Sequence, residues 1–434
     1  MYIIYNPPDI CWHILNNTMS QYYLCFYHTF GLNGVDIWYI PPFKEAGLTR
    51  LTGSIAPTKA FTSFQQWVTH CITGGVNGTA GDIMEVHANT LPVDLLFCKV
   101  QFWAASHLCT LPKSHPLYNI VRKASTRLVN THCSPLHFLF YTTRLHPNKV
   151  ETIQPVWCQQ TYRAAFNTVI SADKESVLEL ANSTNRSLPI RVYSDGSRYK
   201  GGIGAAAILY KGNHIINKLH YYLGPDTKHT VYEGEVISIT LGFQILHKWN
   251  RQLTDTVLIS SDNQASLKAL NNQNTKPGHY LLDEVHDAAE ALHTKQDKLF
   301  KSRLHHDTRA WGDTWVPSTH NVIDIRLQCM LGHMDFAPNK EAEKEAKWAA
   351  QGYSSPSRDL PKYLRKQLLV SVSVLQQQSN TKLQQCWAHQ WKALPCYHHL
   401  CSIDNFAPLK KFLTLTKISL ANNLPSSCNS TQAE

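Results

Sequence analysis

Tyr193-Ser-Asp-Gly-Ser197 places a carboxylate at the end of an apolar segment, directly before a turn residue. The segment that leads into it, Leu188 to Asp195, contains β-branched and aromatic residues and is bounded by Pro189 and Gly196, which predicts a β-strand. An Asp-Gly pair after a strand is more often a turn than a catalytic group. The interpretation of Asp195 therefore depends on the segments that follow it.

Two further segments predict an antiparallel meander. Gly201–Tyr210 and His214–Tyr222 both have strand composition, and Lys211-Gly-Asn213 between them is a hairpin signal. Asp195 is therefore expected on the first of three consecutive strands.

The hydrophobic period then changes to that of a helix. Apolar residues recur at helical spacing within His229–His247, which predicts an amphipathic helix. Glu233 and Glu235 lie near its start, where a carboxylate can simply complement the helix dipole.

A second candidate carboxylate follows a buried strand. Asp255–Ser261 holds a short apolar run, typical of a strand covered on both faces, and it leads into Asp262. The next segment, Asn263–Leu270, is a predicted helix, so Asp262 has an alternative role as the N-cap of that helix.

The last strand and helix of this region carry one more acid. Val322–Cys329 alternates as a strand does, and Lys340–Ala350 is a predicted helix that contains Glu343. If these segments converge, their acids form a carboxylate cluster, and such a cluster is costly unless a metal neutralises it.

The order of these segments and four of their motifs resemble type 1 ribonuclease H. More narrowly, they are similar to the ribonuclease H domains of fungal non-LTR (LINE-like) retrotransposons. The motifs are Tyr193-Ser-Asp-Gly-Ser197, Thr230-Val-Tyr-Glu-Gly-Glu-Val236, Ser261-Asp-Asn-Gln-Ala265, and Gly332-His333 with Ala342-Glu343. The resemblance implies an α/β fold with a ribonuclease H-like mixed five-stranded sheet flanked by helices and preceded by a mainly helical region.

The resemblance also implies a site. Asp195, Glu235 and Asp262 match the three core metal-binding acids, and Glu235 is preferred to Glu233 because it directly precedes the apolar helix. Glu343 occupies a position where the family usually has Asp, and it would weakly complete the metal-binding set. The implied cofactor is two Mg²⁺ ions, with Mn²⁺ as a substitute, because carboxylates are the oxygen ligands that Mg²⁺ prefers.

Three further residues belong to the implied site. His333 matches the mobile histidine that the family is thought to use in product release. Asn263 and Gln264 are expected to contact the hybrid, although ordinary polar residues in a first helical turn would look the same.

Composition sets broader limits. The chain has 434 residues and a net charge of +10, so nucleic acid is a plausible partner, although a generally basic protein is an equally good interpretation of charge alone. Its 12 cysteines contain no C-x-x-C pair, and no charged-then-apolar leader precedes them, which favours an intracellular setting, nuclear or cytoplasmic. No apolar run is long enough for a membrane span, so we expect no membrane partner. We also expect no small-molecule cofactor.

Four regions are predicted along the chain. Residues 1–173 resemble the region that ends the reverse transcriptase of the same elements and contain no Asp-Asp pair, so they are predicted to be a mainly helical remnant without polymerase chemistry. An unrelated helical domain is the alternative. Residues 174–187 are a predicted linker, 188–351 the ribonuclease H type 1 domain, and 352–434 a partly helical tail.

Two predictions concern helices in the later part of the chain. Tyr280–His293 is an amphipathic pattern, and Lys295–Asn321 looks long for a connection from this helix to the next strand. Lys382–Lys392 is a basic helical stretch with Trp387 and Trp391, which would either stack on nucleic acid or pack within a small helical unit.

The sequence therefore predicts an RNA–DNA hybrid ribonuclease that hydrolyses the RNA strand endonucleolytically at a two-metal carboxylate site. The alternative is a catalytically silent retrotransposon remnant that only binds nucleic acid. A metal-free structural protein on the same fold is a third possibility.

Overall fold

The computed structural model describes residues 32, 34–44, 51–76, 78–126, 134–154, 165–170, 188–253, 256–272, 276–311, 323–329 and 336–400. The chain forms two compact units. Unit 1 comprises Met1–His107, Lys123–Leu145 and Gln376–Glu434, and unit 2 comprises Leu108–Arg122 and His146–Leu375.

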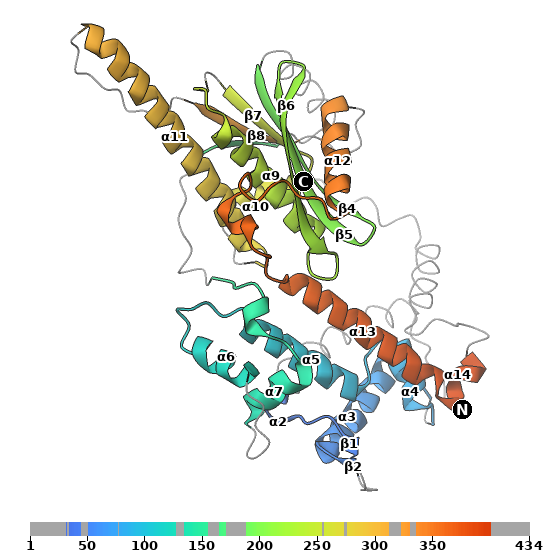
Figure 1. Ribbon diagram of the computed structural model, residues 1–434. Coiled ribbons are helices and arrows are strands. Elements are labelled where there is room, and N and C mark those ends of the chain that lie inside the picture. The colour runs from blue at the N-terminus through green and yellow to red at the C-terminus, as the bar shows by residue number, and fades with distance from the viewer. Residues whose placement is uncertain are drawn as a thin grey trace, which may run out of the picture. The chain divides into compact units, whose positions relative to one another are not determined.

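Unit 2 is built on a six-stranded mixed sheet with the order β3-β8-β7-β4-β5-β6 (Figure 1). β4 pairs antiparallel with β5 and β5 antiparallel with β6, whereas β4–β7, β7–β8 and β8–β3 are parallel pairs. The strands are β3 (Asn167–Val169), β4 (Ile190–Tyr199), β5 (Gly202–Lys211), β6 (His214–Pro225), β7 (Thr256–Ser261) and β8 (Asp324–Cys329).

The antiparallel half of the sheet is the predicted meander. β4 turns into β5 through Lys200 and Gly201, which both have positive φ, as the tightest hairpin turns require. β5 turns into β6 through Gly212, which also has positive φ, within the predicted hairpin signal.

Helices cover both faces of the sheet, α9 (Val231–Lys248) on one and α12 (Ala337–Ala349) on the other (Figure 1). Side chains alternate along β4 accordingly: Val192 lies in the large core with α9, and Tyr193 lies in a small cluster that includes Ala342 of α12. Because both faces are covered, nine of the ten residues of β5 are buried.

The predicted α/β fold, a mixed sheet flanked by helices, is confirmed, with six strands where five are expected. β3 pairs with β8 at the edge of the sheet, from a position before the predicted domain. Phe166, directly before β3, is buried in the core and stacks on His286 of α11 (His279–Trp311) at 5.1 Å between ring centroids.

The second amphipathic helix is longer than its apolar pattern, Tyr280–His293, predicts. α11 spans His279–Trp311, so much of the stretch that follows the pattern is helical. The helix continues because its second half has polar partners. Gln296 accepts a hydrogen bond from the backbone N–H of Leu253 at 2.8 Å, and the Lys295 ammonium donates to carbonyls at the end of α9, including that of His247.

The described part of unit 1 is mainly helical. Its longer helices are α3 (Ile55–Thr73), α4 (Gly81–His87), α5 (Val93–Cys109, ending in unit 2), α7 (Pro135–Thr143) and α13 (Val372–Lys392, beginning in unit 2). Trp387 and Trp391 of α13 are each 3% exposed and pack with Val86 and Leu95. This placement supports the packing interpretation of that basic stretch over a nucleic-acid stacking role.

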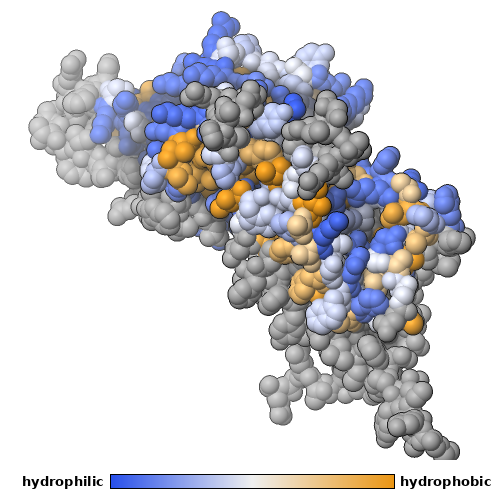
Figure 2. Space-filling view, turned by 90° about the horizontal axis from the view of Figure 1, so that it is seen from below, coloured by the Kyte–Doolittle hydropathy of each residue, from blue (hydrophilic) through white to orange (hydrophobic). Residues whose placement is uncertain are grey.

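Unit 1 also keeps part of its apolar surface in contact with solvent. Figure 2 shows one face of the molecule, on which hydrophobic residues are interspersed with hydrophilic ones. Among the described residues of unit 1, the large exposed hydrophobic side chains include Ile37, Trp67, Val76 and Trp103. No helix in the described ranges is both long and apolar enough to cross a membrane.

Candidate active site

Asp195 and Asp262 come together where β7 ends beside β4. The last residue pair between the two parallel strands is Ser194 with Ser261. β4 continues to Tyr199 against β5 alone, while the chain leaves β7 at Asp262. The carboxyl end of a parallel strand therefore delivers Asp262 next to the middle of β4, where Asp195 lies.

Glu235 reaches the same point from α9. A capping box fixes the start of this helix: the Glu233 carboxylate accepts from the Thr230 N–H at 2.6 Å, and the Thr230 hydroxyl accepts from the Glu233 N–H at 3.2 Å. One turn into the helix, Glu235 accepts a hydrogen bond from the Gly196 N–H at 3.2 Å. The helix therefore docks directly on the residue that follows Asp195.

Gly196 is what allows this close approach. A Cβ atom at this position would lie 2.3 Å from the Glu235 nitrogen and 2.4 Å from the Gly234 carbonyl carbon. Both are backbone atoms of α9, so a side chain here would push the helix away from β4.

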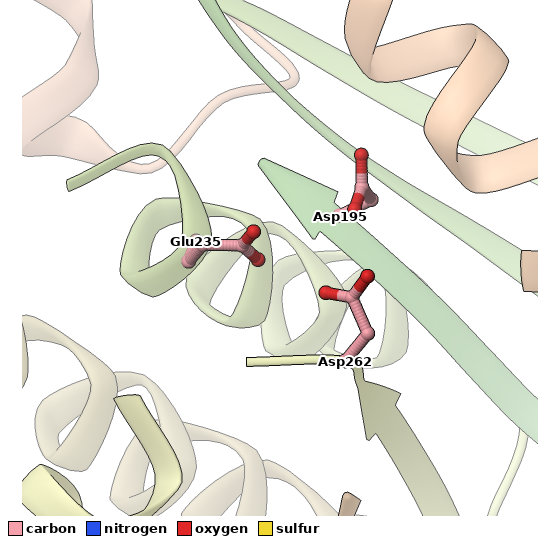
Figure 3. A group of neighbouring side chains, drawn as sticks. All are labelled: Asp195, Glu235 and Asp262. Atoms are coloured by element: carbon pink, nitrogen blue, oxygen red, sulfur yellow. The ribbon is translucent and has the colours of Figure 1, made fainter. Parts of the chain in front are cut away.

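The three acids form one cluster. Asp195, Glu235 and Asp262 each offer a carboxylate oxygen, and these oxygens lie within 4.8 Å of one another. Figure 3 shows the side chains converging from a strand, a helix and a strand end. Asp195 is 4% exposed and Glu235 is 5% exposed, while Asp262 is half-buried, so the cluster opens to solvent on the Asp262 side.

Burial and the repulsion between like charges make the carboxyls of Asp195 and Glu235 hold their protons. Burial, followed by the negative charges of Asp262 and Glu343, raises the pKa of Asp195 to about 7, and the Lys347 ammonium opposes this rise. Burial and the charges of Asp195 and Asp262 raise the pKa of Glu235 well above its ordinary value, against the hydrogen bond from Gly196. Without a cation, the cluster is therefore an unfavourable arrangement of like charges.

The residues fit a divalent cation. The Oδ2 atom of Asp195 is buried and has no hydrogen-bond partner among the described residues, which is costly for an acceptor unless something else satisfies it. Carboxylate oxygens from three different elements, aimed at one point, are the donor set that Mg²⁺ and Mn²⁺ accept. In the described ranges this is the one group of three or more acids, histidines or cysteines whose ligand atoms lie close enough to hold a metal.

Glu343 lies near the cluster but outside it. It belongs to α12, its side chain is 44% exposed, and it accepts from the Lys347 ammonium at 2.6 Å. Its charge still contributes to the raised pKa of Asp195. The structure therefore places Glu343 at the edge of the site, already paired with a cation of its own helix.

The other predicted residues are placed as follows. Asn263 caps α10 (Gln264–Asn271), accepting from the Ser266 N–H at 3.0 Å, and Gln264 is exposed in the first turn. His333 lies outside the described residues.

The sequence does not predict the roles that two residues, Gly196 and Lys347, have at the site. The sequence predicts Gly196 as a turn residue, whereas in the structure it lies within β4 and donates its N–H to Glu235. Lys347 has no predicted role, although its spacing of four residues from Glu343 on a helix is a recognisable signal for an ion pair.

No known family model matches the chain, and no curated protein does. Among solved structures, the chain is similar to RNase H1 from the halophilic archaeon Halobacterium salinarum, at 15% identity and a TM-score of 0.26, over 38% of this chain and 98% of that one. It is also similar to the PFV RNase H domain, at 15% identity and a TM-score of 0.26, over 38% of this chain and 95% of that one. At such TM-scores, neither likeness adds to what the residues themselves support.

Proposed function

We propose that unit 2 is a metal-dependent nuclease that hydrolyses the RNA strand of RNA–DNA hybrids. The observation that carries this proposal is the buried group of Asp195, Glu235 and Asp262, in which a carboxylate oxygen of Asp195 lacks a partner among the described residues. Three acids held together at such electrostatic cost are typical of a site that binds a divalent cation.

The choice of substrate rests on the motifs. The acids that converge in the structure are those that match the core metal-binding acids of type 1 ribonuclease H, in the same order along the chain. The sheet order and strand directions are those of a ribonuclease H-like fold. The excess of Lys and Arg over Asp and Glu, 41 to 31, favours a polyanionic substrate.

In the proposed reaction, the oxygen of a water molecule bonds to phosphorus and one ester bond of the RNA backbone breaks. Asp195, Glu235 and Asp262 would hold the cations. When bound, Mg²⁺ supplies a water of lowered pKa and relief of charge on the leaving oxygen. The chain's own contribution is to fix the acids: Gly196 positions Glu235, and the Thr230–Glu233 capping box fixes the start of α9.

Four further residues have proposed roles. Glu343 would weakly complete the ligand set after leaving Lys347, and His333 would assist product release. Asn263 and Gln264 would lie beside the hybrid at the start of α10, where Asn263 also caps the helix.

One observation favours a second candidate, a silent remnant that binds nucleic acid without cutting it. Glu343 forms an ion pair with Lys347 and is not among the three clustered acids. If the fourth acid is needed for turnover, this pairing would leave the protein able to bind a hybrid but unable to cleave it.

Cleavage of a labelled RNA–DNA hybrid by the full chain separates the two candidates. The enzyme predicts RNA cleavage with Mg²⁺ or Mn²⁺ that is lost in Asp195→Asn and in EDTA, and retained in Asp287→Asn, which removes an exposed carboxylate on α11. Hybrid binding without cleavage under either metal would favour the remnant. Cleavage that persists in Asp195→Asn would refute the site.

A further inference from the structure

A groove lies next to the acid cluster, between the end of β4 and the exposed side of α12. It has a volume of about 690 Å³ and is lined by Tyr199 from the strand and by residues of the helix that include Glu343 and Trp348. Glu343 and Lys347, which line it, are near enough to Asp195 for their charges to act on that carboxyl. The groove therefore shares Glu343 and Lys347 with the surroundings of the proposed active site, although none of the three clustered acids lines it.

The groove carries cationic side chains. Lys340, Lys344 and Lys347 line it from α12, at intervals of four and three residues that keep them on one side of the helix. Of the two acids in its lining, Glu345 is bound to Lys218 at 2.6 Å and to His220 at 2.6 Å. Lys344 is 76% exposed, and its ammonium has one ion pair in the described residues, with Glu341 at 3.9 Å.

Two exposed aromatic side chains, Trp348 and Tyr353, form an aromatic platform at the same groove. Trp348 and Tyr353 stack on each other with ring centroids 4.6 Å apart and an angle of 15° between the planes. They are 43% and 50% exposed, although large aromatic side chains are usually buried. The edge-on contact of His220 with Trp348, at 4.9 Å, holds the indole in place. Tyr199, on the opposite wall, is 38% exposed.

We infer that this groove binds single-stranded nucleic acid that continues from the hybrid held at the acid cluster. This inference rests on the proposed function, because it extends the same substrate. Lysines that follow a backbone, together with exposed aromatic rings on which bases stack, are the two elements of single-strand recognition. Bases within a duplex already stack on each other and cannot reach a ring face, so the aromatic pair selects an unpaired segment.

The test is binding in EDTA, where no metal-dependent cleavage occurs. The full chain is titrated, by fluorescence anisotropy, into a blunt RNA–DNA hybrid and into the same hybrid with a short oligo(U) or oligo(dT) overhang on either end. The inference predicts tighter binding when an overhang is present. The four overhangs show which strand and which polarity the groove accepts.

Substitutions at two residues, Trp348 and Lys344, separate the contribution of stacking from that of charge. Trp348→Ala should weaken overhang binding by about fivefold or more while blunt-hybrid binding stays unchanged, and Trp348→Phe should restore part of the loss. Lys344→Ala should lower the slope of log affinity against log salt by about 0.7 for overhang substrates. Matched controls are Trp67→Ala and Lys301→Ala, which remove an exposed tryptophan in unit 1 and an exposed lysine on α11.

The outcomes separate this inference from the proposed function. If the blunt hybrid is cleaved and no overhang increases the binding affinity, the inference about the groove is wrong and the proposed nuclease function stands. An overhang gain that survives both Trp348→Ala and Lys344→Ala would also overturn that inference, since the site would lie elsewhere. Overhang binding through these residues without cleavage under any metal would support the groove and overturn the nuclease.

Discussion

Asp195 holds an ionisable carboxyl almost entirely out of water, and this has a measurable consequence for stability. Its pKa in the folded protein, about 7, lies above its usual value of about 4, so the folded state binds this proton more tightly than the unfolded chain does. The resulting stabilisation is complete below about pH 4 and is lost as the pH rises through about 7.

We therefore predict that Asp195→Asn stabilises the metal-free protein at about pH 8 by roughly 1 to 4 kcal/mol, and by much less at about pH 5. The amide keeps the shape of the carboxyl and removes one of the repelling charges. Thermal unfolding in EDTA at the two pH values measures the difference, with Asp287→Asn as the exposed control. Mg²⁺ should raise the unfolding temperature of the unchanged protein and not that of Asp195→Asn. A variant that is less stable at both pH values would contradict the electrostatic account.

Gly196→Ala should damage the site through the backbone. The added methyl group meets the backbone of α9 at 2.3 Å, so the helix must shift and Glu235 loses its hydrogen bond from this residue. We expect a loss of roughly 1–3 kcal/mol of stability together with weaker Mg²⁺ binding, measured by denaturant unfolding and by calorimetric titration. Gly242→Ala in α9 is the matched control, because a Cβ atom added there would have a methyl carbon of Val192 as its nearest neighbour, at 3.1 Å. Equal effects at the two positions would argue against a special role for Gly196.

Two of the clustered acids follow local signals that the structure confirms, a helix start for Glu235 and a strand end for Asp262. The strand end predicted at Asp195 is wrong, because β4 continues through Gly196 to Tyr199 by pairing with β5, which no short stretch of sequence shows. The sequence could not distinguish Glu233 from Glu235 by physics alone, since both lie in the first turns of one helix. The structure separates them, because Glu233 turns back to cap the helix and Glu235 faces β4. The ion pair between Glu343 and Lys347 can be predicted from their spacing of four residues on a helix. Whether it keeps Glu343 from the clustered acids depends on where α12 packs in the fold, which the spacing does not show.

At the scale of elements, the start of α9 carries both the capping box and the site residue Glu235. Thr230→Ala removes one side of the capping box, and we predict a loss of about 1 kcal/mol with a small reduction of cleavage, because Glu235 lies two residues beyond the cap partner. Glu235→Gln should do the opposite, abolishing metal-dependent cleavage at little cost in stability. Chemical denaturation and hybrid cleavage measured on both variants test the contrast. Ser302→Ala, which removes an exposed hydroxyl from α11, serves as the control.

The elements that the sequence missed lack a local signal. β3 has three residues, too few to show a strand period, and it exists because β8 offers an unpaired edge. α11 continues far beyond its apolar pattern because Gln296 and Lys295 bond to the segment that ends α9 and to the loop after it. Those partners lie more than 40 residues away in sequence, so no short window contains the reason for the helix.

At the scale of the molecule, the sheet depends on chain segments outside residues 188–351. Phe166, Leu360, Leu364 and Leu368 all lie in the large core. Glu151 accepts from the Gly278 N–H at 2.6 Å, just before α11, and from the Val372 N–H at 2.8 Å, at the start of α13. A buried carboxylate that satisfies the N–H groups of two helix starts connects the segment before the predicted domain to the domain itself.

These contacts predict how truncated proteins behave. A fragment of residues 188–351 lacks four core side chains. Truncating one buried Leu or Phe side chain alone lowers the free energy of unfolding by roughly 2–5 kcal/mol, and the free energy of unfolding of a whole domain is only about 5–15 kcal/mol. We expect this fragment to lack a cooperative unfolding transition and to cleave no hybrid. A fragment of residues 146–375, which retains the core residues and Glu151, should unfold cooperatively in circular dichroism.

Two variants of the longer fragment identify the cause. Phe166→Ala should remove roughly 3–5 kcal/mol, because its ring packs against Phe243 and His286 inside the core. Glu151→Gln keeps the size of the side chain but offers only one acceptor oxygen for two N–H groups, so one helix start loses its partner at a cost of about 1–3 kcal/mol. If the fragment of residues 188–351 unfolds as cooperatively as the longer one, the outer segments pack against the sheet but are not needed for its stability. Activity would then depend on the predicted domain alone. The groove beside α12 would bind a strand less tightly in the fragment of residues 188–351 than in the longer fragment, because the shorter one lacks Tyr353, on which Trp348 stacks.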